Sequence, residues 1–148
     1  MGLRGIVNRN DFHRLAEMRL KEAKALLAAG FPEGANYLAG YAVECALKAC
    51  IAKRTQEHDF PDKKLVDKSY THDVEKLLDA AGLSDSLKND IARNKELDLN
   101  WETVRGWSEQ SRYDLFEGDP TGGWVTARML VHAVESETGG VLRWIRQS

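Results

Sequence analysis

Cysteine is scarce in this sequence, and its two cysteines, Cys45 and Cys50, both fall in an alanine-rich stretch. Five positions apart on a helix, they would point to different sides and could not form a disulfide with each other. Free thiols among apolar neighbours behave as small hydrophobic side chains and indicate a reducing compartment. The spacings typical of metal ligands, such as HxxxH, HExxH and CxxC, are also missing. We therefore expect no metal site and no cofactor.

Long apolar runs and a strong charge imbalance are missing as well. No run reaches the roughly 18 apolar residues that a membrane-spanning helix needs, and the first nine residues are too short and too polar for a signal peptide. With 21 Lys and Arg against 23 Asp and Glu, the net charge is −2. That balance argues against a protein dominated by non-specific phosphate binding, although it allows a local basic patch. We expect a cytoplasmic protein with no membrane contact.

The composition is that of one globular domain spanning residues 1–148, with 43% hydrophobic and 30% charged residues. No segment shows the alternation of apolar and polar residues that is typical of strands, whereas helical spacing recurs along the chain. This pattern predicts an all-α bundle. The segments expected to be helical are about 11–29, 32–54, 72–81, 85–95, a turn or two from Asp98 or Asn100 through Trp107, and a last helix from about Trp124 to Ile145. Residues 55–70 and 108–123 are expected to be loops.

Turn and capping residues define the boundaries of these helices. Gly30 should end the first helix and Pro32 should begin the second, so that the two form an antiparallel hairpin. Gly139-Gly140 should weaken or bend the last helix. The expected N-terminal caps are Asn10 or Asp11, Thr71 and Ser84.

The second predicted helix, about 32–54, is the unusual element because apolar residues cover most of its circumference. Such a helix usually lies at the centre of a bundle with neighbours on several sides. Small side chains along one stripe let another helix approach closely. The residues of this stripe are Ala35, Leu38, Ala42, Cys45, Ala49 and Ala52.

Four polar-tipped residues share one face of this apolar helix: Tyr37, Tyr41, Glu44 and Lys48, at i, i+4, i+7 and i+11. An unpaired charge buried there would cost several kcal/mol, so Glu44 and Lys48 must be paired or must border a cavity. One interpretation is a Glu44–Lys48 pair on a partly exposed face, worth roughly 0.2–0.5 kcal/mol. The other is a pocket or interface lined by two phenols and a carboxylate.

Two further pairs combine a cation with a ring. Arg128 and His132 lie four apart on the last predicted helix and so share a face. An imidazole and a guanidinium can cleave RNA without a metal, because the first moves a proton of a ribose hydroxyl and the second stabilises the phosphorane charge. A surface arginine beside a packed or capping histidine would have the same spacing. Arg112-Tyr113 offers a cation and a stacking ring, or simply a loop packed on the bundle.

One segment resembles a known family. Residues 35–49, ANYLAGYAVECALKA, look like the second helix of HEPN domains, helical modules found in prokaryotes and higher eukaryotes. Three other features agree with this resemblance: the amphipathic helix before it, the segment THDVEKLL at 71–78, and Arg112-Tyr113 ahead of the last helix. The similarity covers roughly residues 11–147.

The resemblance implies an up-and-down bundle of four to five helices that commonly dimerises, often with a functional cleft between protomers. Many such proteins accompany minimal nucleotidyltransferases, and others are ribonucleases of toxin–antitoxin or defence systems. The ribonuclease motif of the family is Arg, four to six residues, then His, whereas Arg128 and His132 have only three residues between them. Glu44 matches the polar helix position that precedes the motif.

Three functions follow from these patterns. The first is a module that binds a nucleotide, RNA or a nucleotidyltransferase partner through a homodimer cleft; its expected ligand-binding residues are Tyr37, Tyr41, Glu44, Lys48, Arg112 and Tyr113. The second is a metal-independent endoribonuclease that uses Arg128 and His132. The third is a purely structural dimerisation module.

Overall fold

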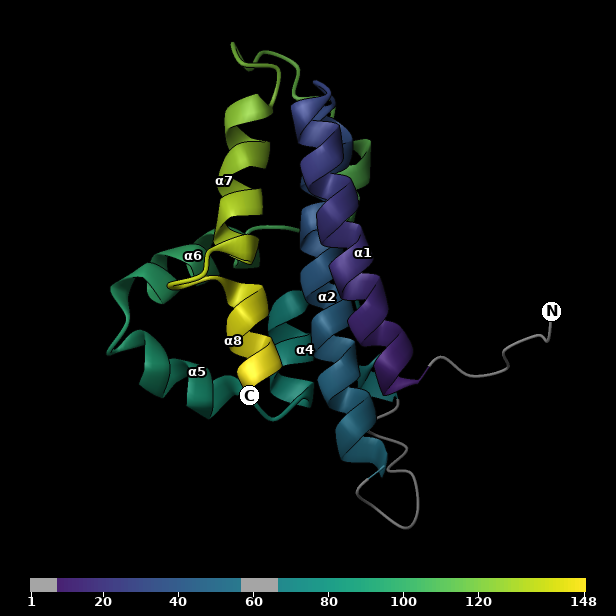
Figure 1. Ribbon diagram of the computed structural model, residues 1–148, viewed down its shortest axis with the longest axis vertical. Coiled ribbons are helices and arrows are strands. Elements are labelled where there is room, and N and C mark those ends of the chain that lie inside the picture. The colour runs from purple at the N-terminus through teal and green to yellow at the C-terminus, as the bar shows by residue number, and fades with distance from the viewer. Residues whose placement is uncertain (1–7, 57–66) are drawn as a thin grey trace, which may run out of the picture.

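The computed structural model describes residues 8–56 and 67–148, apart from the side chains of Gln56 and Arg112, and all regular structure in these ranges is helical (Figure 1). The all-α bundle predicted from the sequence is confirmed. Its elements are α1 (Arg9–Ala28), α2 (Pro32–Gln56), α4 (Val74–Ala80), α5 (Ser84–Ile91), α6 (Lys95–Arg105), the 3-10 helix η1 (Glu109–Tyr113), α7 (Trp124–Glu135) and α8 (Val141–Gln147).

The two longest helices, α1 and α2, form the predicted antiparallel hairpin (Figure 1). Gly30 ends α1 with a φ of +89°, a conformation that glycine adopts without strain, and Pro32 is the first residue of α2. The N-cap is Asn8, not Asn10 or Asp11. Asn8 Oδ1 accepts from the Asp11 backbone N–H at 2.9 Å and Asp11 Oδ2 accepts from that of Asn8 at 3.3 Å, so Asp11 completes the capping box three residues inside.

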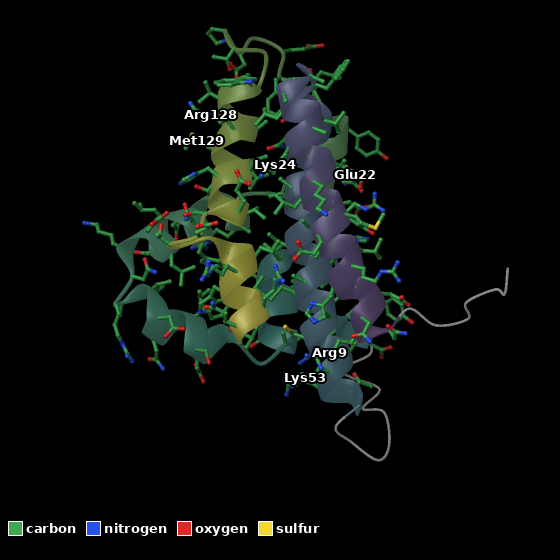
Figure 2. All side chains as sticks on the ribbon, in the orientation of Figure 1. Arg9, Glu22, Lys24, Lys53, Arg128 and Met129 are labelled. Carbon is green, nitrogen blue, oxygen red and sulfur yellow. The ribbon has the colours of Figure 1, made fainter. Side chains whose placement is uncertain are left out.

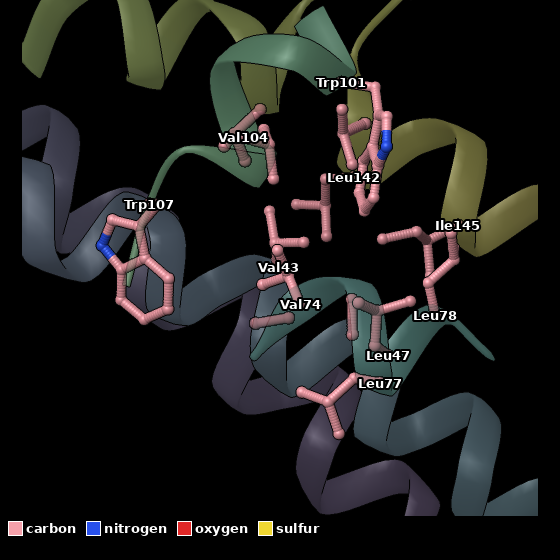
Figure 3. Packing of buried hydrophobic residues seen from close by; sticks show 14 of the residues in the cluster. Val43, Leu47, Val74, Leu77, Leu78, Trp101, Val104, Trp107, Leu142 and Ile145 are labelled. Atoms are coloured by element: carbon pink, nitrogen blue, oxygen red, sulfur yellow. The ribbon is translucent and has the colours of Figure 1, made fainter. Parts of the chain in front are cut away.

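Helix α2 is the central element, as its composition predicted. It contacts α1, α4, α7, α8 and η1. The small residues Ala35, Ala39, Ala42, Ala46 and Ala49 are fully buried, which lets the neighbouring backbones approach closely. Larger side chains from α2, α4, α6 and α8 pack together in the core, as Figure 3 shows for Val43, Val104 and Leu142.

Two expected helix starts are wrong, and in both cases a nearby side chain is the better cap. Helix α4 begins after Asp73, whose carboxylate accepts from the backbone N–H groups of Glu75 and Lys76, while Thr71 only accepts from Asp73 itself. Helix α6 begins at Lys95, because Asn94 accepts from the backbone N–H of Leu97. The expected turn from Asp98 or Asn100 is therefore the middle of a helix.

Other boundaries also differ from the sequence expectations. Helix α5 begins at Ser84 without a side-chain cap and ends at Ile91, and the expected loop 108–123 contains η1. The expected loop 55–70 falls largely on residues 57–66, outside the described ranges.

The last predicted helix is two helices, α7 and α8, separated at residues 136–140. Contacts from α6 hold this break: the Asn100 side-chain amide donates to the Gly139 carbonyl at 2.8 Å, and Asn94 donates to the Thr138 carbonyl at 3.1 Å. A Cβ at Gly139 would lie 2.8 Å from the Glu96 side chain, so the close approach needs glycine there. None of the described helices combines the length and the apolar character needed to cross a membrane.

Gly40 is the position on α2 where the packing tolerates a side chain least. A Cβ there would lie 2.2 Å from the ring of Trp107, which is itself only 6% exposed. In an ordinary helix, replacing Gly by Ala adds about 0.5–1 kcal/mol of stability. We expect Gly40→Ala instead to lower the free energy of unfolding by about 1–3 kcal/mol, the usual cost of overpacking. Urea denaturation followed by circular dichroism measures this change.

Gly34→Ala is the matched control on the same helix. A Cβ at Gly34 meets only the end of the half-buried Leu26 side chain, at 3.0 Å, which can move aside. This variant should be as stable as the wild type or more stable. A Gly40→Ala protein that gained stability to the same extent would contradict the close packing of Trp107 on α2.

Candidate functional site

Among the described residues, Glu44 is the one acidic side chain in the core, 1% exposed on the central helix α2. Its neighbour one turn along, Lys48, donates from Nζ to Glu44 Oε2 at 3.1 Å. The pair expected from the i,i+4 spacing is therefore formed, but in the interior and not on a solvated face. A carboxylate in that position needs a second partner for its other oxygen, because a buried acceptor without a donor costs about 1–3 kcal/mol.

The second partner is His72, whose Nδ1 lies 3.0 Å from both oxygens of Glu44. A carboxylate only accepts hydrogen bonds, so Nδ1 carries a proton in this contact. Nε2 lies 3.6 Å from Glu109 Oε2, beyond hydrogen-bond distance, and 44% of the His72 side chain is exposed. The imidazole thus has one nitrogen fixed in the interior and the other at the surface.

Three segments of the chain meet at this histidine. Glu44 lies on α2, His72 lies two residues before α4, and Glu109 is the first residue of η1. Because α2 packs against both α4 and η1, the Glu44–His72 contact ties the start of α4 to the central helix. We group His72 and Glu109 with Tyr41 of α2 and Tyr113 of η1, the two helices packed together at this point, and call the group the His72 surface.

The phenol of Tyr41 remains protonated over the physiological pH range. Burial, together with the nearby Cys45, Glu44 and Tyr37, raises the pKa of Tyr41 to about 12. Burial and then Glu44 likewise raise the pKa of the Cys45 thiol to about 12, and burial raises that of Cys50. Both cysteines are free. Both thiols therefore stay protonated at physiological pH, and the Tyr41 hydroxyl interacts with the Cys45 thiol one turn along α2.

An aromatic cluster lies beside the carboxylate on α2. The ring centroids of Tyr37 and Tyr41 are 5.9 Å apart, and those of Tyr37 and Trp107 are 6.2 Å apart. Trp107 packs on Gly40, and its indole nitrogen points away from the labelled core residues Val43 and Val104 (Figure 3). All four residues of the polar stripe predicted on α2 therefore lie in one continuous region.

Sequence reasoning missed three members of this region: His72, Glu109 and Trp107. His72 was expected to be an ordinary residue at a helix start, and its distance of 28 positions from Glu44 gives no local signal. The only clue was indirect, because a carboxylate on an apolar helix requires a partner. Tyr113, which was predicted, is 64% exposed at the end of η1. The side chain of Arg112 lies outside the described part of the structure.

The predicted catalytic pair on α7 lies elsewhere. Arg128 and His132 are both exposed, and the Arg128 guanidinium lies over the Trp124 ring, 5.3 Å from its centroid. His132 Nε2 is 3.9 Å from Glu96, whose pKa is held below its ordinary value by hydrogen bonds from Ser136 and Thr138 and by His132. The contacts of this pair, Arg128 with Trp124 on α7 and His132 with Glu96 on α6, involve residues outside the His72 surface.

The Glu44–His72 contact should appear as a coupling free energy. We expect His72→Ala to lower the free energy of unfolding by about 1–3 kcal/mol, because it leaves one buried carboxylate oxygen without a donor. Glu44→Gln should also destabilise, and the double variant should lose less than the two single losses together. Urea denaturation of all four proteins measures this cycle. His132→Ala removes a 66% exposed ring and should change stability by no more than about 0.5 kcal/mol; additive losses at Glu44 and His72 would rule out the coupling.

Comparison with known proteins identifies one family. The sequence model of the HEPN domain matches residues 10–136. No curated protein and no solved structure matches the chain significantly. The matched range begins in α1 and ends just after α7. It therefore includes Glu44 on α2, His72 before α4 and Glu109 on η1. Because the match spans most of the sequence and agrees with the all-helical bundle, this chain belongs to the HEPN domain family.

Proposed function

We propose that this chain binds a nucleotide or RNA at the His72 surface, in a cleft that a second copy of the chain completes. The family supports a nucleotide- or RNA-related helical module in general terms. The single observation that carries the specific proposal is the half-exposed imidazole of His72, which the buried carboxylate of Glu44 holds in one orientation.

The chemistry of this surface suits a base and its phosphates. A fixed imidazole nitrogen can contact a base edge or a phosphate oxygen without losing much conformational entropy on binding. The exposed Tyr113 ring can stack on a base, the contact by which proteins most often hold single-stranded RNA. Glu44 is too deeply buried to touch a ligand. Its role in the proposal is to position His72, so that Tyr41 and His72 supply the polar contacts.

A second copy of the chain is the partner that we propose for this cleft. HEPN domains often dimerise, and both His72 and Tyr113 are exposed in the single chain. A minimal nucleotidyltransferase, the partner that the family resemblance implies, would be a different occupant of the same surface. Light scattering of the purified protein separates these cases, because only the first gives a dimer without any added protein.

Calorimetric titration with nucleoside triphosphates and with a short single-stranded RNA tests the ligand. We expect the wild-type protein to bind at least one of them, and Tyr113→Ala and His72→Ala to weaken binding at least tenfold. His72→Asn is the matched variant, because its amide can still donate to Glu44 while the ring is lost. This variant should be as stable as the wild type, but its binding should be as weak as that of His72→Ala. Silence in every titration, or wild-type affinity in both His72 variants, would refute the proposal.

A metal-independent ribonuclease is the second candidate, and one observation favours it. Arg128 and His132 are exposed on the same face of α7, and each is held by a neighbour, Trp124 and Glu96. In such a reaction the imidazole removes the proton of the ribose 2′-hydroxyl, and the 2′-oxygen attacks the phosphorus. The bond from phosphorus to the 5′-oxygen breaks, the leaving oxygen takes a proton, and the product is a 2′,3′-cyclic phosphate. The guanidinium stabilises the charge on the phosphorane.

Incubation of the purified protein with tRNA in the presence of EDTA tests this second candidate. If it is correct, the wild-type protein cleaves the RNA and His132→Ala reduces the rate by about 10²-fold or more, the usual contribution of a general base. His72→Ala distinguishes the two histidines, because it should leave the cleavage step intact. If His132→Ala cleaves as fast as the wild type, Arg128 and His132 are not the catalytic residues. If the wild type does not cleave RNA, the protein lacks this activity.

A further inference from the structure

Basic side chains from three helices gather at one end of the bundle. Arg9 is the first residue of α1 and Lys53 lies in the last turn of α2, so the antiparallel hairpin brings them to the same end, away from Arg128 (Figure 2). Arg146 of α8 reaches the same region, because its Nη1 lies 2.5 Å from Glu17 Oε1 on α1. His13 lies one turn before Glu17. We call Arg9, His13, Lys53 and Arg146 the basic end.

Acidic groups neutralise this end only in part. Among the described residues, Glu17 is paired with Arg146, whereas neither Arg9 nor Lys53 has a carboxylate partner. Burial and then the charges of Arg9 and Arg146 lower the pKa of His13, against the opposing effect of Glu17. Among the groups of the basic end and Glu17, the cations therefore outnumber the carboxylate, although the net charge of the whole chain is −2.

Arg9 and Lys53 also lie near the same side chain, that of Cys50. Both act on the Cys50 thiol and lower its pKa against the larger, opposing effect of burial. Cys50 is half-buried on α2, one turn before Lys53. The two cations therefore both lie near one position where α1 and α2 pack together.

The basic end is separate from the His72 surface. From Glu44 to Lys53 the helix advances nine residues, which is about 14 Å along its axis and about half a turn around it. The two side chains consequently point to opposite sides of α2. A single mononucleotide at His72 cannot reach Lys53, whereas a longer strand with phosphates at regular intervals can reach both.

We propose that the basic end binds the phosphate backbone of an RNA strand; this inference rests on the proposed function and adds a second contact surface to it. Cations spread over three helices suit successive phosphates of an extended strand better than one compact anion. Phosphate contacts carry no sequence information, so this surface provides affinity and orientation and leaves recognition of bases to the His72 surface. An acidic protein would use the same cations, and the experiment must separate it from RNA.

The salt dependence of RNA binding tests the proposal. For single-stranded nucleic acid, each phosphate contact contributes about 0.7 to the slope of log K against log salt concentration. We expect the double variant Arg9→Gln/Lys53→Gln to lower the magnitude of that slope by about 1 to 1.5 for a single-stranded RNA of about 12 nucleotides. Arg93→Gln/Lys95→Gln is the matched control, since it removes one exposed arginine and one exposed lysine at the turn between α5 and α6. Its slope should equal that of the wild type.

The ring of His13 gives a second, direct readout by nuclear magnetic resonance. Phosphates placed on Arg9 and Arg146 would cancel part of the positive potential that lowers the pKa of His13. The pKa of His13 should therefore rise when the RNA is added. In the Arg9→Gln/Lys53→Gln protein the RNA should shift it less.

The outcomes separate this inference from the proposed function. If RNA binds but the double variant keeps the wild-type slope and the pKa of His13 does not change, the proposal for the basic end is overturned. The proposal for the His72 surface then stands. Mononucleotide binding without any RNA binding would do the same. A polyglutamate peptide of equal charge is the comparison. If the peptide raises the pKa of His13 and RNA does not, the surface binds an acidic protein and the RNA proposal is overturned. If neither nucleotides nor RNA bind, both the proposed function and the proposal for the basic end are overturned.

Discussion

The burial of one carboxylate on the central helix is the constraint on which the arrangement around α2 depends. Glu44 is 1% exposed, so its oxygens must find donors inside the protein. Lys48 supplies one from the same helix and His72 supplies the other from the segment before α4. The requirement of a single side chain thus fixes how the start of α4 is attached to the centre of the bundle. It also gives the surface an imidazole with a defined orientation.

The small residues of α2 make this arrangement possible. Five alanines are fully buried, and Gly40 lets the Trp107 ring lie directly on the helix backbone. Trp107 comes two residues before Glu109, so the same close contact that packs the tryptophan also places η1 beside His72. The small residues that allow close packing on α2 therefore also determine which polar groups can approach this helix.

The charges of this chain are distributed unevenly in space, although they nearly balance in number. The His72 surface combines an imidazole, phenols and a carboxylate, whereas the basic end collects cations from α1, α2 and α8 on the other side of α2. Arg128 and His132 form a third exposed group on α7. A ligand with bases and several phosphates would use the first two surfaces for different purposes, because stacking and hydrogen bonds recognise bases while cations attract the backbone.

Features that depend on neighbours in the sequence were determined by the sequence alone: the helical hairpin with Gly30 and Pro32, the apolar central helix, the Glu44–Lys48 pair and the likeness to HEPN domains. The turn, the apolar helix and the pair follow from local spacing, which decides which side chains of one helix meet. The likeness is a pattern of the sequence itself. The tertiary structure decided the rest. That His72 binds Glu44, that Glu109 faces it, and that contacts from α6 separate α7 from α8 all depend on how helices pack, since those partners lie far apart along the chain. Helical periodicity identifies the buried face of a helix, but only the packed bundle determines which distant residue meets it.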